Sequence, residues 1–210
     1  MSGDPSTRLT PLGVMVLALL REGDMHPYEM MRLMRARRDD RLVTIQNGTF
    51  YHTVSRLERA GLLAEVGVDR EGNRPERTTY TLTDSGRDVV VDWVRRELPR
   101  TDRPSEFRVA LAEAHNLPRE EVAELLAVRR AALAAQLEMH TRGLAEADRR
   151  GVPQQYLVEV DREASLLDAE IAWLDRLRAR LTDDPMPWGI ADIPEESLHR
   201  LFALREAQRS

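Results

Sequence analysis

The chain has 210 residues, of which 42% are hydrophobic and 32% charged, and its formal net charge is −5. This balance supplies enough apolar side chain for one or two folded domains and excludes an intrinsically disordered chain. The absence of cysteine excludes disulfides, thiolate metal sites and cysteine nucleophiles. The longest apolar run, Leu12 to Leu20, is shorter than the roughly 20 residues that a membrane-spanning helix needs. We therefore expect a cytoplasmic protein with no membrane partner.

Two amphipathic helices are expected near the start of the chain. The first covers residues 9–20, with Thr10 as its cap and Pro11 at its first position. The second covers residues 27–38, and its apolar spacing predicts that three side chains face the core: Tyr28, Met31 and Met34. The connection between the two helices is short.

The third predicted helix has one polar face. Phe50, Val54 and Leu57 recur at i, i+4 and i+7 as its apolar stripe, and Gly61 is placed to end it. The other face carries short or forked polar groups that suit base edges and phosphates in a major groove. The residues expected to contact DNA here are Gly48, Thr49, Tyr51, His52, Thr53, Ser55 and Arg56. The alternative interpretation is an ordinary amphipathic helix with a solvated face.

A β-hairpin with a charged tip is expected next. Residues 63–68 and 77–82 have strand-like content, and the loop between them is polar. Arginines in such a loop suit the negative potential of a narrow minor groove. The hairpin residues expected to contact DNA are Arg70, Asn73, Arg74 and Arg77. A loop that is charged only because it is solvated is the alternative.

The remainder of the chain is expected to be helical. Thr83 should cap a fourth helix that runs to about Leu98, and Pro99–Pro104 is the expected domain junction. The fold class is therefore mainly α with a small β-hairpin. A winged helix-turn-helix domain, residues 1–98, precedes an antiparallel helical dimerisation domain, residues 105–210.

Two long helices, residues 118–150 and 154–181, dominate the second half, with shorter helices expected at 105–114 and 195–207. The second long helix has an apolar seam with coiled-coil spacing. Two thin antiparallel helices are not expected to bury both of their seams alone, which favours a homodimer. The residues expected to form the dimer are Leu157, Val160, Ala164, Leu167, Ile171 and Leu174.

Enzymatic and metal-binding patterns are missing from the sequence. It has no Walker loop, no dinucleotide-binding glycine motif and no His-Glu-x-x-His, and its five histidines are dispersed. We expect a protein that is not an enzyme and that needs neither metal nor cofactor. Trp93, Trp173 and Trp188 are candidates to line a cavity for a flat apolar effector, with core packing as the alternative for each.

Three stretches of sequence resemble a known family. NGTFYHTVSRLERAGLL and GNRPERTTYTLTDSGR, with HPYEM upstream, closely resemble the signature of the PadR family of bacterial transcriptional regulators over about residues 9–98. The resemblance implies a winged helix-turn-helix, a homodimer formed by the C-terminal helices, and in many members a repressor released by a small aromatic or other hydrophobic effector.

The same resemblance assigns individual residues. It places Gly48, Thr49, Tyr51 and Arg56 on the recognition helix, Gly61 at its end, and Arg74, Arg77 and Tyr80 in the wing. His52 stands where the family commonly has proline, so base preference does not transfer. Pro27 stands where glycine is frequent, so the family's local turn does not transfer.

Together these observations predict a homodimeric, sequence-specific DNA-binding transcriptional regulator that acts as a repressor. A dimer with two recognition helices about 34 Å apart would bind a pseudo-palindromic operator in double-stranded DNA. Two alternatives stay open. One is a helical interaction protein whose winged domain binds protein instead of DNA, and the other is a sensor whose main task is to capture planar aromatic ligands.

Overall fold

The computed structural model describes residues 9–69, 77–183, 186–189 and 192–209. Its N-terminal elements, which we call the head, are three helices, a two-stranded hairpin and a fourth helix. They are α1 (Pro11–Leu19) with the 3₁₀ turn η2 (Leu20–Glu22), α2 (Pro27–Ala36), the 3₁₀ turn η3 (Asp39–Arg41), α3 (Asn47–Arg59), β1 (Leu63–Asp69), β2 (Arg77–Leu82) and α4 (Asp84–Glu97). This order is that of a winged helix-turn-helix and confirms the predicted fold class.

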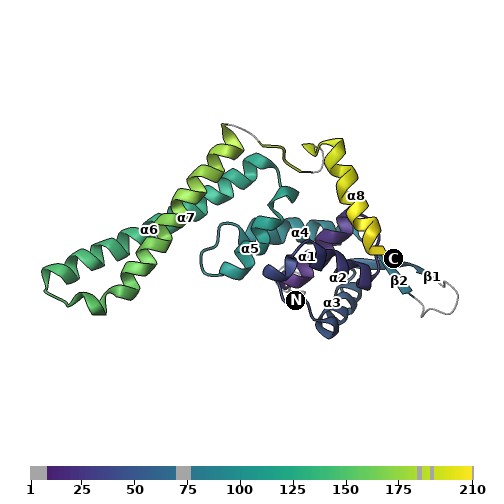
Figure 1. Cartoon of the computed structure of the whole chain (residues 1–210), viewed down its shortest axis with the longest axis horizontal. Helices are drawn as coiled ribbons and strands as arrows, with labels where there is room; N and C mark the ends of the chain where they lie inside the picture. The colour runs from purple at the N-terminus through teal and green to yellow at the C-terminus, as the bar shows by residue number, and fades with distance from the viewer. Residues whose placement is uncertain (1–8, 70–76, 184–185, 190–191, 210) are drawn as a thin grey trace.

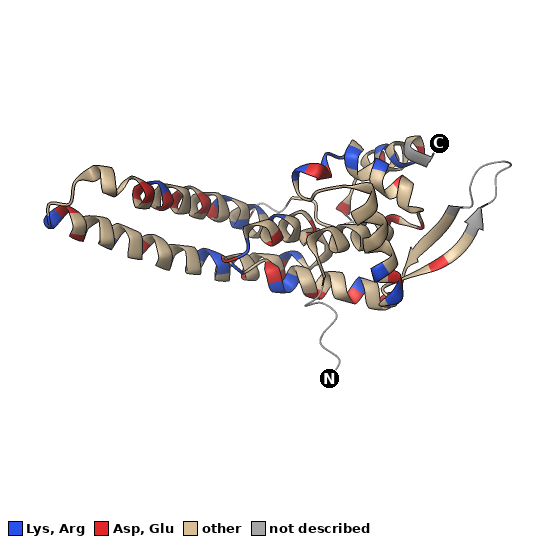
Figure 2. Cartoon of the chain, turned by 90° about the horizontal axis from the view of Figure 1, so that it is seen from below, with Lys and Arg blue, Asp and Glu red and all other residues tan. Residues whose placement is uncertain are grey.

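The C-terminal elements are α5 (Pro104–Ala112), η4 (Ala114–Asn116), α6 (Arg119–Arg149), η5 (Gln154–Tyr156), α7 (Val158–Thr182) and α8 (Glu195–Arg209). Helices α6 and α7 pack against each other as an antiparallel pair that projects from the head, and we call this pair the helical hairpin (Figure 1). Acidic and basic residues are interspersed along it (Figure 2). Across the described ranges, no helix is both long enough and apolar enough to cross a bilayer.

Local sequence explains where two head helices begin. The Thr10 hydroxyl accepts a hydrogen bond from the amide of Gly13 at 3.2 Å, and the Thr83 hydroxyl accepts one from Gly86 at 3.0 Å, as the capping pattern predicts. The Thr83 hydroxyl also donates to the carbonyl of Gly61 at 2.8 Å. Because Gly61 ends α3 with φ +69°, one threonine connects the end of α3 to the start of α4.

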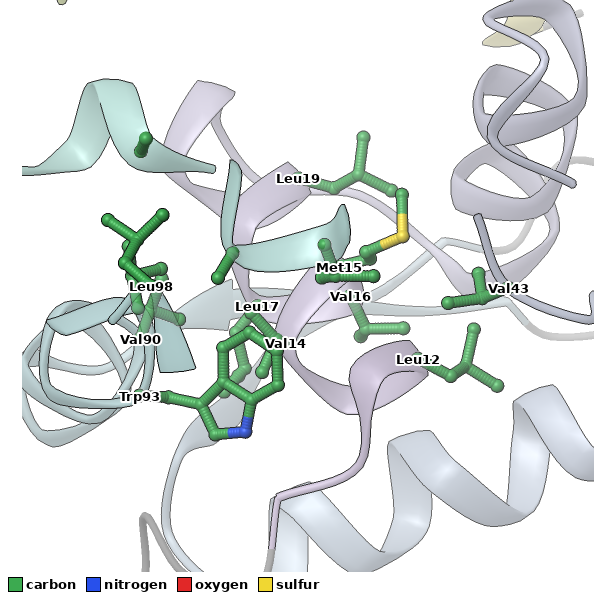
Figure 3. Packing of buried hydrophobic residues seen from close by; sticks show 14 of the residues in the cluster. Leu12, Val14, Met15, Val16, Leu17, Leu19, Val43, Val90, Trp93 and Leu98 are labelled. Atoms are coloured by element: carbon green, nitrogen blue, oxygen red, sulfur yellow. The ribbon is translucent and has the colours of Figure 1, made fainter. Parts of the chain in front are cut away.

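The core of the head joins α1, α2, α3 and α4. Phe50 and Trp93 are among its largest fully buried side chains, and Figure 3 shows Trp93 of α4 beside Val14 and Leu17 of α1. The expectation that Tyr28 faces inward is wrong, because its side chain is 47% exposed. Met31 and Met34 are buried as predicted, and Met30 and Leu33 of the same helix are buried with them.

The wing is attached to the segment that precedes α2. Strands β1 and β2 are antiparallel from Leu63↔Leu82 to Asp69↔Arg77, with an irregularity between Glu65 and Gly67. Met25 adds an isolated bridge to Tyr80, with N···O distances of 3.1 and 3.0 Å. The hairpin is therefore hydrogen-bonded to a third piece of backbone, which limits its motion relative to α2.

The predicted dimer seam of α7 is partly used within one chain. Leu167, Ile171 and Leu174 are buried, because α7 packs along α6 of the same molecule. This burial differs from our expectation that the two helices need a second copy to cover these residues. Leu157, Val160 and Ala164, nearer the tip of the helical hairpin, are only half-buried. The role of the whole seam in dimerisation stays a prediction.

Candidate nucleic-acid interface

Helix α3 presents most of its predicted DNA-contacting residues to solvent. Those exposed are Gly48, Thr49, Tyr51, His52 and Ser55. Thr53 is different, because it is only 5% exposed and its hydroxyl donates to the carbonyl of Thr49 at 2.8 Å. It is next to Val54 and three residues after Phe50, so it lies on the flank of the buried stripe. Thr53 therefore exposes little of its surface, although it also lines the groove between α3 and the start of α1.

Arg56 joins α3 to the start of α1. Its side chain is half-buried, and Nη2 donates to the hydroxyl of Thr10 at 3.2 Å. A groove of about 460 Å³ opens at this place between α3, the first residues of α1 and residues 42–44. Thr49, His52 and Arg56 line it from α3. The groove is mostly apolar, and the hydroxyl, imidazole and guanidinium groups on its α3 side are of the hydrogen-bonding type that base edges and phosphates require.

An arginine of α2 holds the first turn of α3. Arg35 donates from Nη2 to Oδ1 of Asn47 at 3.2 Å, and its side chain is exposed. The sequence analysis did not include Arg35 among the DNA-contacting residues. The four arginines within residues 32–38 were a usable signal for it. Arg32 of the same helix lies over the Tyr28 ring at 5.7 Å from the centroid. Arg37 faces elsewhere and binds both carboxylate oxygens of Glu22 at 2.5 and 2.8 Å.

The predicted wing residues divide into two groups. Arg70, Asn73 and Arg74 lie outside the described residues. Arg77 is the first residue of β2, and its backbone pairs with Asp69 at the outer end of the ladder.

Tyr80 connects the wing to α3. Its hydroxyl donates over a long 3.5 Å to Oε2 of Glu58. Burial, together with the nearby carboxylates of Glu58 and Glu65, raises the pKa of Tyr80, so the phenol keeps its proton and remains a donor. Tyr80 thus has a structural role, because its hydroxyl group joins the wing to α3.

A second concave site lies between the head and the α5–η4 segment. It is a cavity of about 580 Å³ with apolar walls from α1 and charged groups around them. Its lining includes Met15, Leu19, Arg21, Arg87, Glu113 and His115, and it includes none of the three tryptophans. Trp93 is buried in the core, and Trp188 donates from Nε1 to the carbonyl of Leu117 at 2.9 Å. Trp173 is half-buried on α7. None of the three tryptophans lines this cavity, and the assignment of Trp93 and Trp173 to an effector stays a prediction.

The cavity contains a carboxyl group that titrates near neutral pH. Burial raises the pKa of Glu113 to about 7, although a hydrogen bond from Asn116 at 3.0 Å opposes the change. The carboxylates of Asp39 and Glu22 raise it further, whereas Arg21 lowers it. Burial and the charge of Arg87 lower the pKa of Arg21. Within the described ranges, no group of three histidine or acidic side chains is placed to hold a metal ion.

Comparison with known proteins finds a family to which the head is similar. No curated protein matches the chain. Residues 16–91, from α1 into α4, match the model of the transcriptional regulator PadR-like family. Among solved structures, the chain is similar to Bacillus subtilis PadR in complex with operator DNA, with 20% identity, a TM-score of 0.39, and 82% of this chain and 99% of that chain covered.

Two further structures are similar at the same level. Bacillus subtilis PadR in complex with p-coumaric acid is 19% identical, with a TM-score of 0.37 over 82% of this chain and 99% of that one. The PadR-like regulator BC1756 from Bacillus cereus is 15% identical, with a TM-score of 0.36 over 84% of this chain and 100% of that one. The family match over residues 16–91 confirms the resemblance found in the sequence: this part of the head is similar to the transcriptional regulator PadR-like family.

Proposed function

We propose that the chain is a homodimeric repressor that binds a pseudo-palindromic operator through α3 and the wing. The observation that carries this proposal is the exposed polar face at the start of α3, formed by Gly48, Thr49, His52 and Ser55 beside a groove that also contains Arg56. A helix with this face fits a major groove, which admits one α-helix. The division into a DNA-binding domain at residues 1–98 and a dimerisation domain at 105–210 is part of the proposal.

The roles of the α3 residues follow from their positions. The first amides of the helix suit a phosphate, because they have no intrahelical partner and lie at the positive end of the helix dipole. Gly48 leaves open space, because a Cβ added there would have no atom within 4 Å, so a DNA backbone can approach. Tyr51, His52, Ser55 and Arg56 are assigned to bases or phosphates, and buried Thr53 is left out. The arginines of the wing loop, Arg70, Arg74 and Arg77, with Asn73, are assigned to the adjacent minor groove.

The surface of the helical hairpin supports a dimer. Several large apolar side chains are exposed on or next to it, namely Val128, Met139, Tyr156, Val158 and Leu166. Exposed apolar side chains on one pair of helices suit a protein interface. We assign a second copy of the chain to this surface, with the half-buried seam residues Leu157, Val160 and Ala164 contributing at its tip. The dimer then sets the separation of the two α3 helices near one turn of DNA, about 34 Å.

The 580 Å³ cavity is our candidate for an effector site. Met15, Ala18, Leu19 and Leu42 supply apolar walls for a small hydrophobic or aromatic molecule. The head forms one side of the cavity and α5–η4 forms the other, so a ligand there contacts both. Such a ligand releases DNA only to the extent that it prefers a head orientation different from the DNA-bound one.

The test has two steps. DNA fragments that the protein retains from its own genome are sequenced, and the recovered operator is then compared with a scrambled duplex at two salt concentrations. We expect a preference of about 1,000-fold or more for the operator and weaker binding of both duplexes at higher salt. Equal, salt-insensitive binding of both duplexes would instead support a head that binds protein. Quenching of tryptophan fluorescence by planar aromatic acids tests the effector site separately from DNA binding.

A further inference from the structure

The last helix of the chain returns to the head. Helix α8 packs against α2, although more than half of the chain separates the two in sequence (Figure 1). Two contacts join the segment before α8 to the chain at the start of α6. Trp188 donates from Nε1 to the carbonyl of Leu117 at 2.9 Å, and Arg119 pairs with Asp192 at 3.1 Å. The tail therefore connects the end of the helical hairpin to the head by a route separate from the α4–α5 junction.

Arg205 is the anchor of α8 on the head. Its Nη1 donates to the carbonyl of Glu22 at 2.6 Å, its Nη2 donates to the carbonyl of Asp24 at 2.7 Å, and its Nε lies 3.5 Å from Oε1 of Glu29. The side chains of Arg205 and Glu29 are only 15% and 3% exposed. A planar guanidinium with five donors matches three acceptors in this arrangement, whereas an ammonium would not.

The head is shaped to receive this guanidinium. Gly23 has φ +128°, a conformation that L side chains rarely adopt, and a Cβ there would lie 2.8 Å from Nη1 of Arg205. The glycine therefore leaves the space that Arg205 occupies and turns the flanking carbonyls toward it. The carboxylate of Glu29 is buried, and a buried carboxylate requires a charged or hydrogen-bonding partner. We call the surface formed by Glu22, Gly23, Asp24 and Glu29 the guanidinium socket.

The guanidinium socket lies directly beside the root of the wing. Asp24, whose carbonyl binds Arg205, precedes Met25, and the Met25 backbone pairs with Tyr80 of β2 at 3.0 and 3.1 Å. Tyr80 in turn contacts Glu58 of α3. A continuous path of hydrogen bonds and covalent backbone therefore runs from α8 through residues 22–25 to the wing and α3. Each step is a direct contact between neighbouring backbone or side-chain groups, which is the physical form that coupling between sites takes.

We propose that the guanidinium socket is a docking surface for α8 of the same chain, and that Arg205 is a positioning residue that holds the root of the wing and thereby strengthens DNA binding. The occupant is the chain's own tail, because residues 186–189 and 192–209 already follow a continuous path of contacts to the socket. The effect on DNA rests on the proposed function, whereas the effect on the wing root does not.

The test compares Arg205→Ala with Arg200→Ala by hydrogen exchange of the full-length protein without DNA. Arg200 is an exposed arginine of the same helix that pairs with Glu196 one turn away, so its removal controls for the loss of a charge from α8. We expect amides in the peptides 22–29 and 77–82 to exchange about 10-fold faster in Arg205→Ala, since hydrogen bonds to a charged group are lost. Arg205→Lys should give an intermediate rate, and Arg200→Ala should match the wild type.

Unchanged exchange at both peptides in Arg205→Ala would overturn the inference. Protection of peptide 22–29 that rises with protein concentration would overturn the in-chain assignment and give the arginine to a second copy. On DNA, Arg205→Ala should weaken operator and scrambled duplex by one common factor of about 2 to 30, with an unchanged salt dependence because no phosphate contact is lost. If the wild-type protein binds neither duplex, the proposed function fails while the exchange result still decides the role of Arg205 at the wing root.

Discussion

The backbone of Gly86 lies so close to Leu62 that a Cβ at residue 86 would overlap the Leu62 carbonyl oxygen and approach Cδ1 of Leu82 to 2.7 Å. Gly86 is in the first turn of α4, and Leu62 joins α3 to β1. This contact, together with the Thr83–Gly61 hydrogen bond, brings the end of the recognition helix, the root of the wing and the start of α4 to one place. Any side chain at residue 86 would separate them.

Gly86→Ala is therefore expected to destabilise the protein by about 1–3 kcal/mol or more, because the obstructing atom belongs to the backbone and cannot rotate away. Thermal unfolding followed by circular dichroism measures the change. Gly143→Ala is the matched control, because it is also a helical glycine but has no atom within 4 Å of the added Cβ. It should be neutral or stabilising by up to about 1 kcal/mol. Equal melting temperatures for the two variants would contradict the close contact.

Arg56→Ala should reduce the preference for the operator over a scrambled duplex more than it reduces the overall affinity for DNA. If Arg56 reads a base, the operator should lose about 1–3 kcal/mol of binding free energy relative to a scrambled duplex. Fluorescence anisotropy with both duplexes at one salt concentration measures this difference. Arg59→Ala is the control on the same helix, since Arg59 is exposed and donates to the carbonyl of Ser55 at 3.2 Å. Loss of the same factor on both duplexes would assign Arg56 to a phosphate.

Arg74→Ala should weaken binding to every sequence. Loss of one phosphate contact lowers the slope of log K against log salt by about 0.9, with little change in sequence preference. Titrations at four or more salt concentrations give the slope. Arg142→Ala removes an equal charge from the exposed surface of α6, where its side chain is 77% exposed, and should leave the slope unchanged. An unaltered slope in Arg74→Ala would remove this residue from the interface.

Glu113→Gln should make stability less dependent on pH. The pKa of Glu113 is raised to about 7 from an ordinary 4.5, so the folded state binds this proton more tightly than the unfolded chain. The resulting stabilisation is complete below about pH 4.5 and is lost as the pH rises through about 7. Urea unfolding should therefore show similar midpoints for wild type and Glu113→Gln at pH 5, and a higher midpoint for the variant at pH 8. Glu138→Gln, on the exposed surface of α6, should show no such pH-dependent difference.

Arg129→Met is expected to loosen the joint between the head and the helical hairpin. Arg129 is 3% exposed, lies 3.5 Å from the Phe107 ring centroid, and donates to Glu170 at 2.7 and 2.9 Å and to the carbonyl of Arg100. Removing one partner of such a pair costs about 3–5 kcal/mol when both are buried, and less here because Glu170 is 33% exposed. Urea unfolding measures the loss.

Arg129→Lys should recover only part of that stability. The lysine keeps the positive charge but cannot stack on Phe107 and bind the carboxylate with a planar fork at the same time. A variant with lysine as stable as the wild type would show that charge alone matters at this joint.

Local patterns were sufficient for most of the fold. Threonine caps, glycine ends and apolar periodicity located nearly every helix, because these signals act within a few residues. Two side chains do not lie as the patterns predicted. Tyr28 has the spacing of a core residue but is displaced by four neighbouring apolar side chains, and Thr53 has a polar side chain but finds its partner in the preceding turn. The position of Tyr28 depends on how α2 packs against the rest of the head, whereas the Thr53 hydrogen bond is formed within α3.

The candidate DNA-binding site was likewise predictable where it depends on one helix, and not where it depends on contacts between helices. The exposed residues of α3 follow from the helical period, whereas the Arg35–Asn47 and Arg56–Thr10 contacts join different helices and depend on the tertiary arrangement. The cavity beside Glu113 had no sequence signal, since its walls come from α1, η3, α4 and η4, which are distant in the chain. The aromatic residues predicted a ligand site elsewhere, and none of the three tryptophans lines this cavity.

The hydrogen bond between Thr10 and Arg56 has a practical consequence for work with this protein. Anything fused ahead of α1 emerges beside the surface that we assign to DNA. A polyhistidine or other charged purification tag at that end would add its own attraction or repulsion for the duplex, so apparent affinities should be compared before and after its cleavage.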